Sequence, residues 1–501
     1  MLWSIVPLIL FGSWLWSTGW PLYRNWRRAK ALNLPIILSP ISRQGVLHRT
    51  GSWTFREKFS IHAKYGKIFI LVTPITCDIY VADGKAAKHI LDRRNEFLKP
   101  NKLLAKIAAF GQNLATVEGE QWQRHRRLTG RAFHDQTHRI AWDEAYKHAS
   151  FLVKTWDTSD TVRSPQSDMA RLSLNVLFDA CFDLPHQTGS SGVVKDVASL
   201  QTHLEIYLRS LTHDHPAILQ AGRASGALLG ESIQRLIENR KASDRKPTQS
   251  DLLSSMMMLP RQSGLSESEI AGNLFLFFFA GHETTASTLL YITNLLAIFP
   301  KWQDWAIEEV DKIVSEFQSD TPLEYQSIYP RWKRLRAILY ETIRLYGPVP
   351  TIVRATNDQD QTLPISNGEI VVSKNTSVNI NCMALHTDPD VWGEDCLEWN
   401  PGRWISTASD SSLEDELFPL LSKGFFGWGS GPRICPGQRF SQIEVLAVLV
   451  CLLRNHYVTI VPEDGQSFKE AQLHTLRMIE NSSMLLTLQM SHVQGMRLVK
   501  R

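Results

Sequence analysis

The sequence predicts a mainly helical protein with a small β-sheet, preceded by one apolar segment at its amino terminus. Three observations lead to this prediction. Apolar residues recur at helical spacing through nearly all of residues 84–346, β-like segments flank turn residues nearer the two ends, and residues 1–22 carry no charged side chain. The 501 residues, 43% hydrophobic and 21% charged, are typical of a globular protein, which excludes a disordered, collagen-like or coiled-coil chain.

The amino-terminal segment is long enough to cross a membrane. As a helix, residues 1–22 would extend about 33 Å, against ~30 Å for the hydrocarbon layer of a bilayer. Basic residues follow this segment, whereas a cleaved signal peptide carries its charges before a shorter apolar stretch; they are Arg24, Arg27, Arg28 and Lys30. We therefore expect a retained single-pass anchor, with the rest of the chain in the cytosol by the positive-inside rule.

The remaining chain predicts a connector and one large domain. Residues 23–45 contain the basic residues together with Pro35 and Pro40, a composition typical of a short stiff linker. Residues 46–501 contain no internal repeat and no low-complexity tract that would mark a further boundary. We therefore expect residues 46–501 to form a single catalytic domain.

Two β-like segments near the start of this domain predict a hairpin. Ile68–Val72 and residues 78–81 are rich in β-branched and apolar residues, and Thr73-Pro74 between them is typical of a turn. Further β-like segments lie at residues 371–380 and 484–490. We therefore expect a small sheet to which both ends of the chain contribute.

The longest predicted helix lies in the middle of the domain. Ser266 and Glu269 match a capping box, and the helical pattern continues to about Ile298, before Pro300. Such a helix would be about 50 Å long, enough to cross a whole domain. The polar residues at 281–283 interrupt its apolar run, so an internal helix is favoured over a second membrane span.

Charge and cysteine content exclude several classes of protein. The formal net charge of +4 is too small, and too evenly spread, to favour a nucleic-acid partner. The six cysteines form no C-x-x-C pair, which disfavours a zinc ribbon or a disulfide scaffold and favours a reducing compartment. For five of them, all except Cys435, we expect packing as small apolar residues.

Cys435 occupies a different kind of sequence: it lies within the glycine-rich segment at residues 426–437, between a turn and the start of an apolar helix. Backbone N–H groups and the positive end of the helix dipole favour a thiolate there, which predicts a metal ligand. The glycines let the backbone approach a flat, bulky cofactor, and Arg433 is placed to meet a carboxylate on it.

This segment resembles the signature of the cytochrome P450 family, F-x-x-G-x-R-x-C-x-G. The matching residues are Trp428 at the Phe position, Gly431, Arg433, Cys435 and Gly437. The resemblance implies the cytochrome P450 fold and haem b (iron protoporphyrin IX), with Cys435 as the iron ligand. Trp428 departs from the pattern but keeps an aromatic face over the sulfur.

A second segment, A-G-H-E-T-T at residues 280–285, is similar to the family's [AG]-G-x-[DE]-T-[TS] stretch. Residues 273, 277, 280, 281 and 284 are expected on one helical face, with small residues beside a hydroxyl. The resemblance implies room for dioxygen beside Ala280, with Thr284 as a hydrogen-bonding group and Glu283 as a proton relay. The alternative is an ordinary buried helix whose threonine bonds its own backbone.

A third segment, Glu341 to Arg344, resembles the family's E-x-x-R helix, and residues 401–404 resemble its P-x-R-[FW] segment. The resemblance implies a structural network of Glu341, Arg344 and Arg403 that holds the cysteine loop. The alternative for an i,i+3 pair is a weak solvated salt bridge. Gly402 stands where an acid is common in the family, which leaves a fourth member of the network in doubt.

Residues that would bind the haem propionates come from three segments. Trp122 and Arg126 resemble the W-x-x-x-R of the family's third helix and share a helical face. Arg354 is expected to bind a propionate beside Arg433. Two histidines invite assignment as axial ligands, but we expect each to be solvated or on the distal side of the haem; they are His125 and His282.

The resemblance implies a monooxygenase that inserts one atom of dioxygen into a hydrophobic small molecule. No G-x-G-x-x-G follows a predicted strand, so electrons from NADPH would come through a separate NADPH–cytochrome P450 reductase. Four basic residues are candidates for its docking surface: Arg124, Arg127, Lys423 and Arg439. By position in the family, the substrate pocket would include Phe277, Phe278, Val349, Ile352 and Met484.

The chain is also similar to microsomal fungal enzymes that tailor secondary metabolites, which implies the endoplasmic reticulum membrane and a terpenoid, alkaloid or polyketide substrate. One alternative is a haem-thiolate isomerase or dehydratase that acts on a peroxide without a reductase; the pair Glu283-Thr284 argues against it. Another is a membrane protein that binds haem to sense or store it. NADPH oxidation coupled to product formation would separate these functions.

Overall fold

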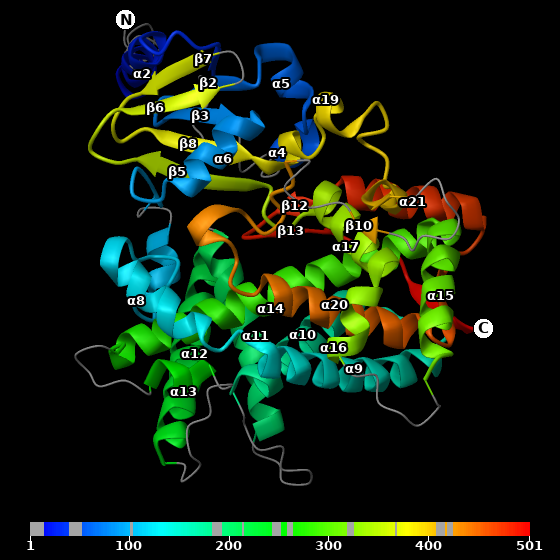
Figure 1. The fold of residues 1–501 in the computed structure, drawn as a ribbon. Helices are drawn as coiled ribbons and strands as arrows, with labels where there is room; N and C mark the ends of the chain where they lie inside the picture. Colours follow the sequence, from blue (N-terminus) through cyan, green and yellow to red (C-terminus); the bar gives the residue numbers. More distant parts are fainter. Residues whose placement is uncertain are drawn as a thin grey trace, which may run out of the picture. The chain divides into compact units, whose positions relative to one another are not determined.

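The computed structural model describes residues 15–39, 53–100, 104–182, 193–212, 215–242, 252–257, 264–317, 325–365, 368–406, 416–417 and 424–501. Contacts divide the chain into two units. The first unit comprises residues 1–100, 349–398 and 419–435, and the second comprises residues 101–348, 399–418 and 436–501. Figure 1 shows the strands of the first unit and the helices of the second.

The first unit is organised around a sheet of six strands, in the order β1-β2-β3-β8-β5-β4. The strands β2 and β3 form the predicted antiparallel hairpin, with Ile70 opposite Ile79, so this prediction is confirmed. The bounds are β1 Ile36–Leu38, β2 Ile68–Val72, β3 Cys77–Val81, β8 Ser377–Asn381, β5 Thr351–Thr356 and β4 Phe97–Leu98, with a separate hairpin of β6 Gln361–Ile365 and β7 Gly368–Val372.

Short helices surround this sheet. Helix α6 (Gly84–Asp92) begins where the Asp83 carboxylate accepts a hydrogen bond from the N–H of Ala86, and its apolar face joins the sheet residues in the core. Ala29 of helix α2 (Trp20–Lys30) is buried in the same core. The remaining helices of the unit are the π-helical turn η1 Leu15–Gly19, α4 Trp53–Glu57, α5 Ser60–Tyr65, α18 Cys382–Leu385, α19 Pro389–Trp392 and the 3₁₀ turn η6 Gly431–Arg433.

The second unit is helical. Its elements in chain order are η2 Ala105–Ala108, α8 Gly119–Gly130, α9 Asp135–Asp157, α10 Pro165–Phe182, α11 Val193–Thr212, α12 Pro216–Ala242, α13 Leu252–Met257, α14 Glu267–Ile298, α15 Pro300–Val314, α16 Tyr325–Ile328, η3 Tyr329–Arg331, α17 Lys333–Tyr346, η4 Pro401–Trp404, α20 Gln438–Leu453 and α21 Phe468–Glu480. Helix α10 packs between α9 and α14, and α20 packs on α9 (Figure 1). Three short antiparallel strand pairs complete the unit: β9 Ile405–Ser406 with β10 Glu416–Leu417, β11 His456–Ile460 with β14 Met496–Lys500, and β12 Ser483–Met484 with β13 Leu488–Gln489.

The long helix α14 confirms the prediction made for it. The hydroxyl of Ser266 accepts from the N–H of Glu269, and the Glu269 carboxylate accepts from the N–H of Ser266 over 2.8 Å. This capping box satisfies backbone donors that the first turn leaves unpaired. The helix then runs to Ile298, and from Thr285 onward every residue is buried.

The main sheet receives strands from only some of the expected segments. Residues 351–381 contribute β5 and β8, but the expected contribution of residues 484–490 is wrong, because β12 and β13 pair with each other as a hairpin and β11 pairs with β14, all in the second unit. Most of the predicted anchor, residues 1–14, lies outside the described residues; residues 15–30 are helical. Among the described residues, no helix combines the length and the apolar character needed to cross a membrane.

Candidate functional site

The loop that carries Cys435 is built on glycines of the first unit. Gly429 and Gly431 have φ angles of 76° and 69°, which side chains rarely adopt. A Cβ atom on Gly431 would also lie 2.5 Å from the carbonyl oxygen of Leu91, so only glycine fits beside α6. The N–H of Cys435 donates to the carbonyl of Trp428 over 3.0 Å. The loop is thus held in a tight turn, and Cys435 at its end is exposed.

Aromatic residues support the other side of this loop. The N–H of Phe426 donates to Nε2 of His386 over 2.9 Å, and the His386 ring stacks on Phe425 with centroids 4.9 Å apart. Trp428 meets the same Phe425 ring edge-on at 6.0 Å. His386 was not predicted from the sequence, because it lies 40 residues before its partner and belongs to no recognisable motif.

Basic side chains gather in the first unit. Burial, together with the charges of Arg433 and Arg354, lowers the pKa of Lys99 to about 6. Burial also lowers the pKa of both Arg354 and Arg433 to about 10. An anionic ligand would offset both the burial and the mutual repulsion of these charges, so the cluster suits the binding of carboxylates or another anion. Lys99 was missed by the sequence analysis, since an isolated lysine gives no pattern.

The other five cysteines are wholly or partly shielded from solvent. Cys181, Cys382, Cys396 and Cys451 are buried, and Cys77 is half-buried. Burial raises the pKa of Cys77 to about 11 and that of Cys382 to about 12. Because the thiolate is the form that binds a metal, these two thiols are poor ligands at neutral pH.

The residues of the first unit fit the haem that the sequence resemblance implies. Haem brings an iron that can bind a thiolate, a flat ring that needs close approach of the backbone, and carboxylate side groups. An exposed Cys435, the missing side chain at Gly429, and the cluster of Lys99, Arg354 and Arg433 match these three features in turn. The donor set is therefore suited to this cofactor.

Helix α14 of the second unit carries the A-G-H-E-T-T segment. The hydroxyl of Thr284 donates to the carbonyl of Ala280 over 2.8 Å, which is the backbone bond that the alternative interpretation expected. Oxygen lone pairs of the hydroxyl still allow Thr284 to accept another hydrogen bond. A Cβ on Gly281 would lie 3.0 Å from Leu177 of α10, so Gly281 faces that helix.

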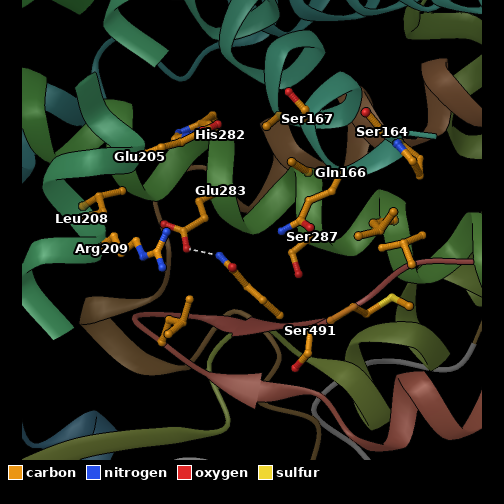
Figure 2. Close-up of a pocket in the computed structure, with 18 of the residues that line it drawn as sticks. Ser164, Gln166, Ser167, Glu205, Leu208, Arg209, His282, Glu283, Ser287 and Ser491 are labelled. Carbon is orange, nitrogen blue, oxygen red and sulfur yellow. Dashed lines mark hydrogen bonds between the residues drawn. The ribbon is translucent and has the colours of Figure 1, made fainter. Parts of the chain in front are cut away.

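The carboxylate of Glu283 points away from its helix toward the hairpin formed by β12 and β13 (Figure 2). Its Oε1 accepts from the hydroxyl of Thr487 over 2.7 Å and from the amide of Gln489. Burial raises the pKa of Glu283, and the charge of Glu205 raises it further, while these two donors act in the opposite direction. Thr487 and Gln489 lie more than 200 residues from Glu283 in the sequence, and no sequence pattern predicted these two contacts.

The E-x-x-R pair of the second unit lies in the protein interior. Both side chains are fully buried, and Arg344 donates to the two oxygens of Glu341, from Nε and Nη2, over 2.8 Å each. Arg403 donates to Glu341 from Nε over 2.9 Å. The backbone N–H of Asn400 and the indole N–H of Trp404 also donate to this carboxylate, over 2.8 and 3.0 Å. The structure thus brings the three predicted residues together and adds two donors.

Trp122 and Arg126 both lie in α8, and Trp122 is buried while Arg126 is half-buried. His125 between them is fully buried, with Nε2 3.2 Å from the Glu269 carboxylate and Nδ1 2.9 Å from the Asn273 amide. His125 is therefore not solvated, and its expected place on the distal side of the haem stays a prediction.

His282 is also buried and close to the carbonyl of Phe278, and burial lowers the pKa of His282 to about 4.

The four basic residues proposed as a docking surface differ in their surroundings. Arg124 forms an ion pair with Glu269. The guanidinium of Arg439 lies 3.4 Å from the ring centroid of Tyr329. Arg127 is exposed, and Lys423 lies outside the described residues. The sequence alone gives no sign of the contacts that engage Arg124 and Arg439.

The five predicted substrate residues are divided between the units. Val349 and Ile352 belong to the first, and Phe277, Phe278 and Met484 to the second. Phe278 is fully buried between Phe178 and Phe182, with the first of these rings stacked on it at 5.0 Å. Phe278 is thus a core residue, whereas Phe277 faces Phe133 at 5.8 Å.

A cavity of about 570 Å³ lies within the second unit (Figure 2). Its walls come from the start of α10, the end of α11, the middle of α14 and the residues that follow β12. Glu283 and His282 line it, and the five predicted substrate residues do not.

Comparisons with known proteins agree with this picture. The model of the cytochrome P450 family matches residues 38–486. The chain is 25% identical to a cytochrome P450 monooxygenase of Arthrobotrys oligospora, over 99% of this chain and 93% of the relative. It is 28% identical to the phomenoic acid biosynthesis cluster cytochrome P450 monooxygenase of Leptosphaeria maculans, over 94% and 84%. It is also 26% identical to a cytochrome P450 monooxygenase of Penicillium roqueforti, over 81% and 78%.

Proposed function

Because the chain belongs to the cytochrome P450 family, we propose that it inserts one atom of dioxygen into a hydrophobic small molecule, with haem b as cofactor. The prediction that the chain is a cytochrome P450 monooxygenase is confirmed. The predicted fold, mainly helical with a small sheet, is confirmed as well. The observation that carries the proposal is the exposed Cys435 at the end of a glycine turn, in a unit that also holds a cluster of basic side chains.

The proposed reaction consumes one substrate molecule RH, one dioxygen, one NADPH and one proton, and yields ROH, water and NADP⁺. The hydride of NADPH supplies two electrons and one proton, and solvent supplies the second proton. We propose that a separate NADPH–cytochrome P450 reductase passes the electrons on. When bound, haem supplies the activation of dioxygen at its iron.

The side chains of this protein then have distinct roles in the proposal. Cys435 binds the iron through its sulfur, and Lys99, Arg354 and Arg433 hold carboxylate groups of the cofactor by charge. Trp122 and Arg126 are proposed as further donors to these carboxylates. The Glu283 carboxylate holds and passes on a proton, and Thr284 accepts a hydrogen bond beside it. Glu341, Arg344 and Arg403 act structurally.

The thiolate ligand is tested by the carbon monoxide difference spectrum of the reduced, haem-loaded full chain. We expect the Soret band shifted to long wavelength that is typical of a thiolate ligand, and its loss in Cys435→Ser. Cys77→Ser is the matched control and should keep the band, because Cys77 is half-buried with a raised pKa. A wild-type band without this shift would contradict the proposal.

Turnover is tested with purified reductase and NADPH. We expect product to form only when both are present. A peroxide rearranged at the same rate without reductase would instead identify an isomerase or dehydratase, and haem binding without NADPH consumption would indicate a non-catalytic protein.

We further propose that the substrate is a secondary metabolite such as a terpenoid, alkaloid or polyketide. The support is the similarity to the phomenoic acid biosynthesis cluster enzyme of Leptosphaeria maculans. A comparison of metabolites before and after gene deletion should show one hydrophobic precursor accumulating, and adding purified enzyme, reductase and NADPH to that precursor should restore the product. An unchanged metabolite profile would count against this substrate class.

We also propose that residues 1–22 anchor the protein in the endoplasmic reticulum membrane. Trp16, Trp20 and Tyr23 are exposed and precede a run of basic residues, an arrangement typical of a membrane interface. The full chain should remain in the membrane pellet after alkaline carbonate extraction, and a chain lacking residues 1–22 should be released. Equal release of both would contradict the anchor.

A further inference from the structure

One face of helix α14 carries polar residues at intervals of four, at positions 283, 287 and 291. Each is bonded to the same segment, residues 482–489, which contains the hairpin of β12 and β13. The hydroxyl of Tyr291 donates to that of Ser482 over 2.8 Å, and the hydroxyl of Ser287 donates to the carbonyl of Leu488 over 2.9 Å. Residues spaced by four share a helical face, so this polar stripe fastens the hairpin to the helix.

At the end of this stripe, the two carboxylate oxygens of Glu283 differ in their hydrogen bonds. Both hairpin donors, the Thr487 hydroxyl and the Gln489 amide, reach Oε1. Oε2 is buried, and no group within the described part of the chain forms a hydrogen bond with it. The same amide lies 3.3 Å from the Thr487 hydroxyl, so the two donors also hold each other in place.

The Glu283 side chain forms part of the wall of the 570 Å³ cavity (Figure 2). Other titratable or charged residues that line the cavity come from α11, α14 and the two chain segments beside them; they are Arg163, Glu205, Arg209, His282 and His492. Serine and glutamine side chains contribute to the same walls and can form hydrogen bonds with water in the cavity. A proton held on Glu283 is therefore next to a polar cavity.

We propose that Thr487 and Gln489 are positioning residues for the reaction: they fix the Glu283 carboxylate through Oε1 and leave Oε2 as the atom that takes up and releases the proton. This inference rests on the proposed monooxygenase function. It assigns a chemical role to a hairpin more than 200 residues away from the oxygen-activation segment in the sequence. Thr487 is buried, so its hydroxyl is held against the carboxylate.

The electrostatics of the site predict the direction in which the pKa of Glu283 moves when a donor is removed. Burial raises the pKa of Glu283, Glu205 raises it further, and the two donors lower it. Hydrogen bonds to the ionised form stabilise that form, so removal of a donor raises the pKa again. His282 stays neutral near pH 7 because burial lowers its pKa to about 4, and it therefore adds no charge that would counter this change.

The test compares Gln489→Leu and Thr487→Val with Tyr291→Phe and Thr487→Ser. Tyr291→Phe removes a hairpin attachment without touching Glu283, and Thr487→Ser keeps the hydroxyl donor. The first readout needs no turnover: the carboxyl band of Glu283 is isolated as the infrared difference between each protein and its Glu283→Gln derivative, and is titrated with pH. We expect the titration to move to higher pH in Gln489→Leu and Thr487→Val only.

The second readout is NADPH consumption and hydrogen peroxide release with reductase and dioxygen. Loss of one donor should slow NADPH consumption about 2-fold to 10-fold at neutral pH, the equivalent of one hydrogen bond of about 0.5–1.5 kcal/mol. The acidic limb of the pH profile of NADPH consumption should move to higher pH in Gln489→Leu and Thr487→Val. The carbon monoxide spectrum should stay that of wild type, which shows that the haem site is intact.

The outcomes separate the two levels of the proposal. If Gln489→Leu leaves both the carboxyl titration and the pH profile unchanged, or if Tyr291→Phe changes them equally, the hairpin has only a structural role and the inference is overturned. If the carboxyl titration moves as expected but the wild type binds haem and consumes no NADPH, the proposed function fails, although Thr487 and Gln489 still set the protonation of Glu283.

Discussion

Two glutamates of the second unit, Glu341 and Glu283, are both withdrawn from solvent but have opposite hydrogen-bond patterns. Glu341 is fully buried, and five described donor groups share its two oxygens. Glu283 has both of its donors on Oε1, and its Oε2 is buried without a described hydrogen-bond partner. Both oxygens of the Glu341 carboxylate are thus occupied by donors, whereas one oxygen of Glu283 remains available to carry a proton.

The difference also separates a structural role from a chemical one. Two arginines lie against Glu341, so its negative charge is compensated within a buried network. No cation is among the causes that shift the pKa of Glu283, and the charge of Glu205 disfavours its ionised form.

The largest effect is expected for Glu341→Gln. This change leaves the buried guanidinium groups of Arg344 and Arg403 without their anion, and breaking a buried pair in this way costs about 3–5 kcal/mol. The free energy of unfolding is measured by urea titration of the full chain. Glu308→Gln is the control, because Glu308 is exposed and its pair with Arg334 contributes at most ~1 kcal/mol. Equal effects of the two changes would refute a buried network.

A smaller effect is expected for Trp404→Phe. The change removes the indole N–H that donates to Glu341 over 3.0 Å, and a hydrogen bond to a charged group contributes about 1.5–3 kcal/mol. Trp399→Phe is the matched control, since its indole donates over 3.1 Å to the uncharged hydroxyl of Thr342, at about 0.5–1.5 kcal/mol. If the control loses as much free energy of unfolding as Trp404→Phe, the charge of Glu341 adds nothing to this bond.

A third carboxylate, Glu444 of α20, sharpens the comparison through pH. Burial raises the pKa of Glu444 to about 8, against 4.5 for an ordinary glutamate, and the nearby hydroxyl of Ser173 only partly opposes this. Between about pH 4.5 and 8 the folded state therefore binds more protons than the unfolded chain, so the free energy of unfolding falls as pH rises. The slope from one group is at most ~1.4 kcal/mol per pH unit.

This slope is measured by urea titrations at a series of pH values. Glu444→Gln should flatten the dependence, because a neutral amide has no proton to lose. The same flattening in Glu308→Gln, whose carboxylate is exposed, would show that the slope has another origin.

The sequence predicts only part of the difference between the hydrogen-bond patterns of Glu341 and Glu283. Glu341 and Arg344 stand three residues apart on one helix, so their pairing is a local property and could be predicted. The donors from Asn400 and Trp404 come from a segment about 60 residues later, and those of Glu283 from one more than 200 residues later. Such contacts depend on how the chain packs, which helical spacing does not encode.

The same distinction applies to the fold and to the cysteine loop. The hairpin of β2 and β3 and the capping box of α14 are local and were predicted, whereas the insertion of β8 between β3 and β5 joins segments about 300 residues apart. Gly431 could be picked out in the signature, but its contact with Leu91 could not. Lys99 was likewise invisible, because only the folded first unit brings it near Arg354 and Arg433.

The smallest effect on stability is expected for Glu283→Gln. Glutamine keeps an oxygen that can accept from Thr487 and Gln489, and it removes a charge whose burial is unfavourable, as the raised pKa indicates. The free energy of unfolding should therefore change by less than ~1 kcal/mol, since no buried partner loses its only hydrogen bond. NADPH-dependent turnover should nevertheless fall, because an amide cannot carry the proton. A loss of stability comparable to that of Glu341→Gln would show that Glu283 belongs to a structural network after all.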